Sequence, residues 1–500
     1  MKRWSRRTRA KSKRGDRTGL RHPTQRLWGG TALLALTLSI LYTFRLSIFK
    51  PPFVHFLGWS QVVGQLVVIT IVVFLWVGYL HLRKGQMLEQ KRLRRFLFGL
   101  VLIVALLGRA MDLLAPYLVP ENLSGYLIPA ALGAGLATIF LDAEVGLAVA
   151  ALLSLLVGLD QTLNPIAALI AAFGGSLVAV TRAAHLQKLS VLVIAGFQIG
   201  LVSLLLHGAV TLSAGLPQLN GAALLWSLLN GIVSASLILI SLPLAERLTQ
   251  KTSPLGLVEL LNPSQPLLVR MREEAPGTYH HSTNVADLAE SAAQAIGANS
   301  LLVTVGAYYH DIGKLRRPEF FTENQQGEGN PHDELAPNMS KMILTSHIKD
   351  GIELAKEYGL RDDIIQFIPR HHGTSVIRYF YLKALRARGE GSSVSIDDYR
   401  YDAPLPNSKE TAILMLADSV EAASHSIEDD GQLAGMVEGI VQERLSDGQL
   451  AESPLTLADL AQIKQAFCQT LRAMRHRRRV TYPKADELKA EAAQAERGRE

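Results

Sequence analysis

The sequence is poor in cysteine and in charged residues. Cys468 is the only cysteine among the 500 residues, so no intrachain disulfide can form and an oxidising compartment is not implied. We interpret Cys468 as a small buried residue of a helix. Charged residues make up 19% of the chain and hydrophobic residues 48%, a balance that is unusually apolar for a soluble enzyme. The composition therefore indicates that much of the chain lies in a membrane.

Two nucleotide-binding signatures are also absent. Before residue 400 the sequence has neither a glycine-rich phosphate-binding loop nor a series of stretches with strand-like alternation. From residue 250 onwards the apolar residues recur with helical spacing, and proline or glycine stands at the breaks. The sequence therefore predicts an all-helical soluble domain rather than an α/β nucleotide-binding fold.

Long apolar runs are concentrated in roughly the first 245 residues. A membrane-spanning helix needs about 20 apolar residues. Eight segments are candidates: 28–49, 59–80, 96–118, 124–141, 143–159, 165–180, 189–212 and 220–244. Those between 124 and 180 are short and closely spaced, so six or seven spans with a re-entrant pair remain an alternative. The predicted fold class is all-α, with a polytopic helical membrane domain followed by a cytoplasmic helical domain.

Positive charges indicate the orientation in the membrane. Residues 1–27 contain eleven Lys or Arg and one acid, directly before the first apolar segment. The loops expected inside, 81–95 and 181–190, are basic. The loops expected outside, 119–123 and 213–219, have no basic residue. The turn near 143 is the one inside loop without positive charge. Because basic loops face the cytoplasm, we predict an uncleaved multi-pass membrane anchor, with both the N-terminus and the C-terminal half cytoplasmic.

Histidines of the soluble half occur mostly beside other metal-ligating residues. They fall as HH at 280–281, HD at 310–311, SH at 346–347 and HH at 371–372, and Asp418 stands further along. Imidazole and carboxylate ligands together suit Fe, Mn, Zn or Ni better than Mg. The set exceeds what one ion needs, so it predicts two divalent metal ions, with Asp311 as the natural bridging carboxylate.

A site with two metals about 3.5–4 Å apart fits the hydrolysis of a phosphoester, because the ions activate a water molecule and neutralise the phosphate. Lys314 follows His310 and Asp311 by one helical turn. We predict that Lys314 faces the same site and holds a phosphate oxygen. Asp311 and Lys314 are therefore the candidate catalytic residues.

Seven motifs follow one another in the soluble half: PGTYHHS, GAYYHDIGKLRRPEFFTENQ, NPHDELAPNMS, SHIKDGIELAKEYGL, RHHGT, YFYLKA and MLADSVEAAS. In this order they resemble the HD domain of the seven-transmembrane HD family, the PgpH-type cyclic-di-AMP phosphodiesterases of bacteria. The resemblance covers about residues 250–480 densely, and the membrane half agrees with it in architecture. A single HDxGK motif would be weak, since HD hydrolases act on many nucleotides.

The resemblance implies a complete set of seven metal ligands, with Asp311 shared between two ions. The ligands of the two ions would be His281, His310, Asp311 and Asp418 for one, and Asp311, His347, His371 and His372 for the other. His280 would be a neighbour rather than a ligand. The resemblance further implies Mn or Fe as the metal and hydrolysis of cyclic-di-AMP to the linear dinucleotide pApA. Because the family is bacterial, it also implies that the membrane is the bacterial inner membrane.

The predicted domains are a basic cytoplasmic segment (1–27), a membrane domain (28–245), a cytoplasmic HD phosphodiesterase domain (246–482) and a polar tail (483–500). Segment 388–408 also resembles the family around YRYDAPLPNSKE and is predicted to border the site. Many family members carry a sizeable extracellular domain after the first span. Here only about ten residues, FKPPFVHFLG, separate spans one and two, so the usual outside sensor is missing.

Three alternatives stay open from the sequence. An HD enzyme could instead hydrolyse cyclic-di-GMP, although RHHGTSVIRYFY lacks the GYP motif typical of that group, or guanosine tetraphosphate. A third alternative is a membrane receptor that binds a nucleotide and signals without hydrolysis. The expected partners are a cyclic dinucleotide and the lipid membrane, with no nucleic-acid polymer, and a homodimer is left open.

Overall fold

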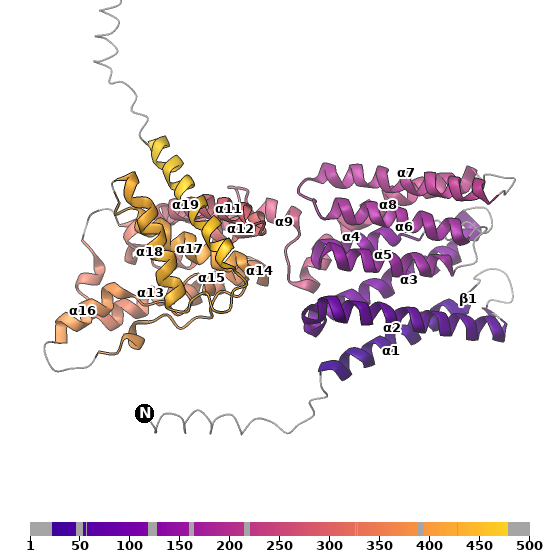
Figure 1. Cartoon of the computed structure of the whole chain (residues 1–500), viewed down its shortest axis with the longest axis horizontal. Helices are drawn as coiled ribbons and strands as arrows, with labels where there is room; N and C mark the ends of the chain where they lie inside the picture. Colours follow the sequence, from indigo (N-terminus) through magenta and orange to yellow (C-terminus); the bar gives the residue numbers. More distant parts are fainter. Residues whose placement is uncertain are drawn as a thin grey trace, which may run out of the picture. The chain divides into compact units, whose positions relative to one another are not determined.

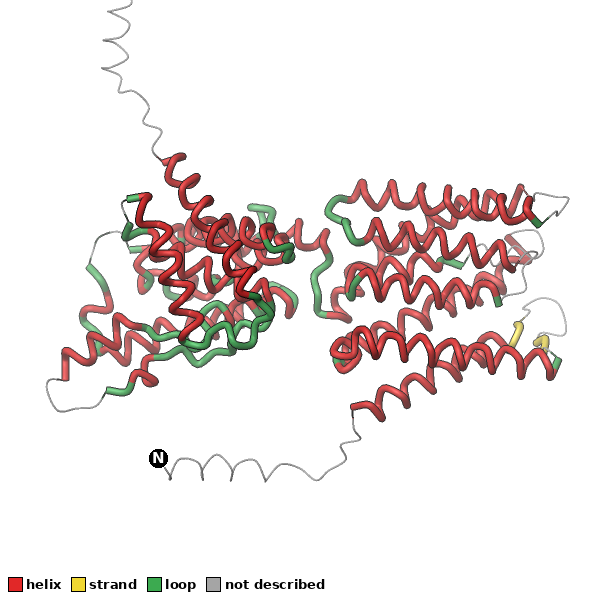
Figure 2. Tube along the Cα trace, viewed as in Figure 1, coloured by secondary structure: helices red, strands yellow, loops and turns green. Residues whose placement is uncertain are grey.

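The computed structural model describes residues 23–46, 54–56, 58–118, 128–159, 165–214, 221–325, 327, 329–388, 394–427 and 429–478. Most of the predicted basic segment (1–27) and the whole predicted tail (483–500) lie outside these residues. The chain divides into two compact units, Met1–Thr249 and Gln250–Glu500. Both units are built of helices, which confirms the predicted all-α fold class (Figure 2).

The first unit, here called the membrane unit, contains eight helices in its described part, one for each predicted apolar segment. They are α1 (Pro23–Thr43), α2 (Trp59–Glu89), α3 (Lys91–Leu118), α4 (Ala130–Phe140), α5 (Ala143–Gly158), α6 (Pro165–Ala183), α7 (Leu189–Ser213) and α8 (Gly221–Thr249). Figure 1 shows them side by side as a bundle. One local difference is that α1 ends at Thr43, where a three-residue strand β1 (Phe44–Leu46) pairs antiparallel with β2 (Val54–Phe56).

Four of these helices are long and apolar enough to cross a membrane, namely α2, α6, α7 and the Leu224–Thr249 part of α8. Three further apolar helical segments are shorter: Leu27–Thr43 in α1, and α4 and α5. The protein is therefore a multi-pass membrane protein, and the number of eight spans stays a prediction.

Small residues let the helices of the membrane unit approach closely. A Cβ atom added at Gly200 of α7 would lie 2.3 Å from the carbonyl oxygen of Leu228 in α8, so only glycine fits there. The short helix α4 consists largely of alanine and glycine, and all of its residues except Ile139 are buried. Close packing of this kind stabilises helices in a lipid environment, where burial of apolar surface provides no net driving force between them.

The second unit, here called the HD unit, carries the predicted site. Its helices are α9 (Pro254–Leu260), α10 (Pro266–Glu274), α11 (Pro276–Ala295), α12 (Ser300–Tyr309), α13 (Pro337–Glu357), α14 (Asp362–Ile365), α15 (Phe367–Arg370), α16 (Arg378–Arg388), α17 (Lys409–Ser424), α18 (Leu433–Ser446) and α19 (Leu457–Arg478). Short 3-10 turns η2 to η7 connect several of them. The seven residues from Thr411 to Ala417 in α17 are all buried, so this helix runs through the middle of the core.

Two glycines set the packing that brings the site together. Gly306 of α12 lies against the ring of Phe367 in α15, where an added Cβ atom would be 2.6 Å from ring carbons. Gly313, in the 3-10 turn η2 (Ile312–Arg316), lies against α13, where an added Cβ atom would be 1.8 Å from the carbonyl oxygen of His347. Backbone contact at these points brings the segment around Asp311 next to α13 and α15.

Candidate metal centre

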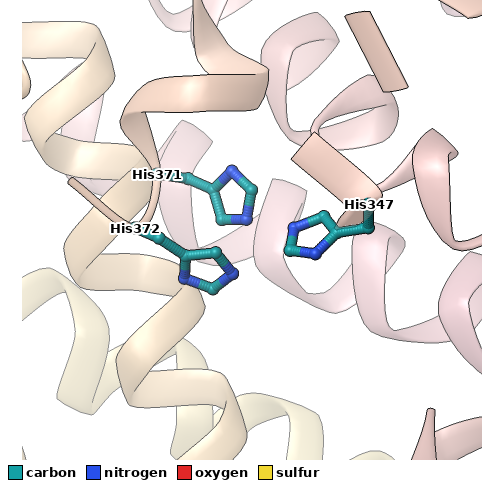
Figure 3. A group of neighbouring side chains, drawn as sticks. All are labelled: His347, His371 and His372. Atoms are coloured by element: carbon teal, nitrogen blue, oxygen red, sulfur yellow. The ribbon is translucent and has the colours of Figure 1, made fainter. Parts of the chain in front are cut away.

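Five elements of the HD unit contribute to one buried cluster of side chains. His281 comes from α11, His310 and Asp311 follow α12, His347 lies on α13, His371 and His372 follow α15, and Asp418 lies on α17. Within it, three groups have ligand atoms that all lie within 4.8 Å of one another: His281, His310 and Asp418; His310, Asp311 and His371; and His347, His371 and His372. The structure thus brings all seven predicted ligands together. Figure 3 shows the rings of the third group turned toward one another.

Asp311 lies at the centre of the cluster and directs one oxygen to each side. Its Oδ2 lies 3.7 Å from Nε2 of His281 and 3.2 Å from Nε2 of His310. Its Oδ1 lies 3.6 Å from Nε2 of both His347 and His371. A carboxylate with two oxygens facing two separate sets of imidazoles has the arrangement that a bridging ligand requires.

The histidine rings are held by the nitrogen that faces away from the cluster. Nδ1 of His310, His347 and His371 lies 2.7, 2.5 and 3.3 Å, respectively, from a backbone carbonyl oxygen three or four positions earlier. When Nδ1–H donates to such a carbonyl, Nε2 keeps its lone pair. In the described part of the chain, these three Nε2 atoms and Asp311 Oδ1 are buried without a hydrogen-bond partner. Buried polar atoms are rarely left in this way, so the donor set fits divalent metal ions.

His281 is held differently. Its Nε2 lies 3.0 Å from Oδ1 of Asp418, and its Nδ1 lies 2.7 Å from Oε2 of Glu421. Glu421 is buried and also accepts a hydrogen bond of 2.9 Å from the side chain of Asn284. The sequence analysis missed Glu421, although its place one helical turn after Asp418 puts both carboxylates on the same face of α17.

Lys314 lies beside the cluster, as predicted, but with two carboxylate partners. Its Nζ donates to Oδ2 of Asp311 at 2.8 Å and to Oε1 of Glu323 at 2.6 Å, and it lies 5.1 Å from the ring centre of Phe321. Glu323 is a second residue that the sequence analysis missed. Glu323 belongs to the PEFFTENQ motif. This motif packs on the start of α11 through hydrogen bonds between Asn324 and Thr278.

An aromatic ring covers the cluster on the side of His372. The ring of Tyr401 stacks on the imidazole with 4.1 Å between ring centres and 19° between planes. The backbone N–H of Tyr401 donates to the carbonyl oxygen of Ser375 at 3.0 Å, so this segment is bound to the residue that follows the RHHGT motif. The predicted bordering segment 388–408 thus contributes one side chain that touches the site.

The electrostatics of the cluster differ between its two sides. Burial alone would lower the pKa of His281, but hydrogen bonds to Asp418 and Glu421 outweigh burial and raise it to about 10. On the other side, burial lowers the pKa of His371 to about 3. Burial also lowers the pKa values of His347 and His372.

The central carboxylate is kept ionised. Burial favours its neutral form, yet the neighbouring His310 and Lys314 hold the pKa of Asp311 well below its usual value. At neutral pH the cluster therefore offers an ionised carboxylate and, at His347, His371 and His372, neutral imidazoles. These are the protonation states in which such side chains bind metal ions.

Each of the two units matches a family model over part of its length. Residues 59–253 match the family model described as a 7TM receptor with intracellular HD hydrolase, and residues 278–423 match the model of the HD domain. The match to the HD domain begins in α11 and ends in α17, so it includes all seven residues of the cluster.

Individual relatives match over most of the chain. A cyclic-di-AMP phosphodiesterase PgpH from Bacillus subtilis is 35% identical over 84% of this chain, and one from Listeria monocytogenes is 35% identical over 83%. The chain spans 60% and 58% of the lengths of these two relatives. A crystal structure of the HD domain of the L. monocytogenes phosphodiesterase PgpH in complex with cyclic-di-AMP is 45% identical, covers 43% of this chain and 99% of its own, and has a TM-score of 0.41.

Proposed function

We propose that this chain is a membrane-anchored, metal-dependent phosphodiesterase that hydrolyses cyclic-di-AMP. The proposal starts from the two family matches, one to a 7TM receptor with an intracellular HD hydrolase and one to the HD domain. The observation that carries this proposal is the position of Asp311, with one oxygen facing His281 and His310 and the other facing His347 and His371. The names of the two relatives at 35% identity support the choice of substrate.

The proposed metal ligands are divided between two ions, Mn or Fe. One ion would be held by His281, His310, Asp311 and Asp418, and the other by Asp311, His347, His371 and His372. When bound, such a pair of ions activates water at neutral pH and neutralises the charge on a phosphate group. The four unpartnered atoms of the cluster support this assignment, because each belongs to a proposed ligand.

The chain's own residues perform the remaining tasks. Asp311 fixes the separation of the two halves of the site, and the helix carbonyls that hold Nδ1 keep the imidazoles aimed at it. Lys314 adds a positive charge beside Asp311, where a phosphate oxygen of the substrate would lie. Addition of water across one phosphodiester bond breaks the bond from phosphorus to the 3′ oxygen. That oxygen leaves with a proton, and the cyclic dinucleotide opens to pApA.

The proposed orientation keeps the HD unit in the cytoplasm, where an intracellular dinucleotide is found. Support comes from the turn between α4 and α5, which has no basic residue of its own. Its acids pair with basic residues of α2: Arg83 Nε lies 2.6 Å from Glu144, and Lys84 Nζ lies 2.8 Å from Asp142. This turn therefore lies at the same end of the membrane unit as the basic stretch 81–95, which forms the end of α2 and the start of α3, as an inside turn should.

The full-length protein, purified in detergent and loaded with Mn²⁺, tests the proposed function. We expect hydrolysis of cyclic-di-AMP to pApA with kcat/KM roughly 100-fold above that for cyclic-di-GMP or guanosine tetraphosphate. The matched variant Asp311→Asn keeps the size of the side chain but not its charge, and we expect it to lose about 10³-fold in kcat.

Three results would contradict the proposal. Faster hydrolysis of cyclic-di-GMP or guanosine tetraphosphate would assign a different HD activity. Binding of cyclic-di-AMP without turnover would make the protein a receptor. Full activity of Asp311→Asn would remove the proposed bridging role of this carboxylate.

A further inference from the structure

We infer that Glu421 is a positioning residue that holds His281 in the tautomer required for metal binding. The inference rests on the proposed metal site, since it concerns how one of the proposed ligands is prepared. Glu421 contacts His281 at Nδ1, whereas Nε2 on the opposite side of the ring faces Asp311 and Asp418. Glu421 acts through the ring of His281.

The contacts of Glu421 fix its carboxylate on both oxygens. Its side chain is only 3% exposed, and Oε2 accepts a hydrogen bond from Nδ1 of His281 at 2.7 Å. Oε1 accepts from Nδ2 of Asn284 at 2.9 Å and from Nε2 of His425 at 3.1 Å. His281 and Asn284 lie three positions apart on α11, so one carboxylate from α17 binds two side chains on the same face of that helix.

A comparison with the other histidines shows why His281 needs this partner. Nδ1 of His310, His347 and His371 faces a backbone carbonyl oxygen of the preceding turn. Nδ1 of His281 instead faces the side chain of Glu421 on α17, 140 positions further along the chain. In the metal-free protein both ring nitrogens of His281 face carboxylates, which accept hydrogen bonds but cannot donate them. When Nε2 gives up its proton to bind a metal ion, the hydrogen bond to Glu421 keeps the remaining proton on Nδ1.

The direction of the ring is as important as its tautomer. Nε2 of His281 points at Oδ1 of Asp418, 3.0 Å away, and at Oδ2 of Asp311, 3.7 Å away. These are the two carboxylates proposed to share a metal ion with it. Asp418 and Glu421 lie three positions apart on α17. The same face of this helix therefore supplies one proposed ligand, Asp418, and the residue that orients another, His281.

A different reading is that Glu421 merely joins α11 to α17. The two readings are separated by Mn²⁺ titration of the full-length protein in detergent after chelation. For Glu421→Gln we expect two Mn²⁺ sites, one of which has a 10–100-fold lower affinity. Losses of this size are typical when a metal-binding histidine loses its hydrogen-bond partner. In a His281→Ala background, the same substitution should cause no further loss of Mn²⁺ affinity, because the ring through which Glu421 acts is gone.

Glu290→Gln is the matched control. Glu290 lies on the same helix as His281 and accepts a hydrogen bond from the side chain of Gln294, away from the cluster. We expect this variant to bind two Mn²⁺ ions with the affinities of the unchanged protein.

Each outcome bears on a distinct claim. If the unchanged protein binds fewer than two Mn²⁺ ions, the proposed metal site is wrong. If the unchanged protein binds two Mn²⁺ ions and Glu421→Gln binds them with the same two affinities, only the positioning role is wrong. A loss of affinity that persists in the His281→Ala background would also overturn the positioning role, since a purely structural effect does not require the imidazole.

Discussion

The candidate ligand histidines are oriented before any metal arrives. In His310, His347 and His371 the ring nitrogen Nδ1 faces a carbonyl oxygen of the same local helix or turn, at distances between 2.5 and 3.3 Å. Binding a metal ion at Nε2 then requires no change of tautomer at these residues. Such preorganisation lowers the conformational cost of binding.

Gly313 gives a test of backbone packing at the residue scale. In Gly313→Ala the new methyl group would lie 1.8 Å from the carbonyl oxygen of His347 and 2.5 Å from the backbone nitrogen of Gly351, so α13 must move. We expect a loss of about 1–3 kcal/mol in the free energy of unfolding and weaker Mn²⁺ binding. Chemical unfolding and Mn²⁺ titration measure the two effects.

The control for this substitution is Gly435→Ala in α18, where an added methyl group meets nothing within 4 Å. Replacing an exposed helical glycine by alanine stabilises a helix by about 0.5–1 kcal/mol. If Gly313→Ala were as stable as Gly435→Ala and kept its Mn²⁺ affinity, close contact at Gly313 would not be what places His347.

Tyr401 offers a second residue-scale prediction. Its ring stacks on His372, so Tyr401→Phe should keep the Mn²⁺ affinity and the activity, whereas Tyr401→Ala should weaken binding by about tenfold, as for other groups that orient a ligand. Mn²⁺ titration of both variants checks this. Equal losses in both would assign the effect to the phenol hydroxyl rather than to the ring.

The sequence predicted the seven members of the cluster but not the groups that orient them. Histidines that recur in pairs or beside an aspartate are rare enough to indicate a metal site, and the structure gathers the seven predicted ligands. Their role as ligands stays a prediction. Glu421, Glu323 and Tyr401 carry no such signal, because an acid or an aromatic residue in a helical protein is ordinary. Their importance arises from packing between elements distant in the sequence, such as the 140 positions between His281 and Glu421.

At the scale of elements, the contact of α11 with α17 depends on charge. His281 on α11 meets Asp418 and Glu421 on α17, and these carboxylates raise the pKa of His281 to about 10. His371, which follows α15, has a pKa lowered to about 3 by burial. The two histidines therefore respond to pH in opposite directions in the metal-free protein.

The free energy of unfolding of the metal-free, EDTA-treated protein should be highest near pH 6.5. Relative to an unfolded value of 6.5, the raised pKa of His281 contributes stability that is present below 6.5 and lost as the pH rises toward about 10. The lowered pKa of His371 contributes stability that is lost as the pH falls from 6.5 toward about 3, because the unfolded chain takes up a proton first. Thermal unfolding of the HD unit in the EDTA-treated protein between pH 5 and 9.5 measures both arms.

Added Mn²⁺ provides the control for this pH profile. Metal binding at Nε2 displaces the proton from His281, so the decline above pH 6.5 should flatten when Mn²⁺ is present. A melting temperature of the chelated protein that rises steadily from pH 6.5 to 9.5 would contradict the proposed ionic contact between α11 and α17.

The elements of the membrane unit were predicted well where long apolar runs define them. Each of the eight predicted segments corresponds to one helix, and α5 follows the prediction of 143–159 closely. The strand pair of Phe44–Leu46 and Val54–Phe56 was missed, because its apolar residues continue the pattern of the preceding span. Strands of only three residues are too short to show the alternation of apolar and polar residues by which a strand is predicted.

At the scale of the whole molecule, the orientation in the membrane can be tested with single cysteines. A Cys468→Ser background removes the only native thiol. Gln187→Cys and Ala214→Cys lie at the two ends of α7 and are exposed there. In intact cells a membrane-impermeant maleimide should label Ala214→Cys, whereas Gln187→Cys should react only after permeabilisation. The reverse pattern would place the HD unit outside the cytoplasm.

The short helix α4 has a consequence for how the protein is made. Its 11 residues extend about 16 Å, roughly half of the hydrocarbon core of a bilayer. Because it consists largely of alanine and glycine, it has little tendency to leave the translocon for lipid by itself. Its surroundings include α8, which begins only at Gly221. Integration of α4 must therefore wait until most of the membrane unit has been synthesised, and a chain truncated before α8 should be recognised by quality-control proteases.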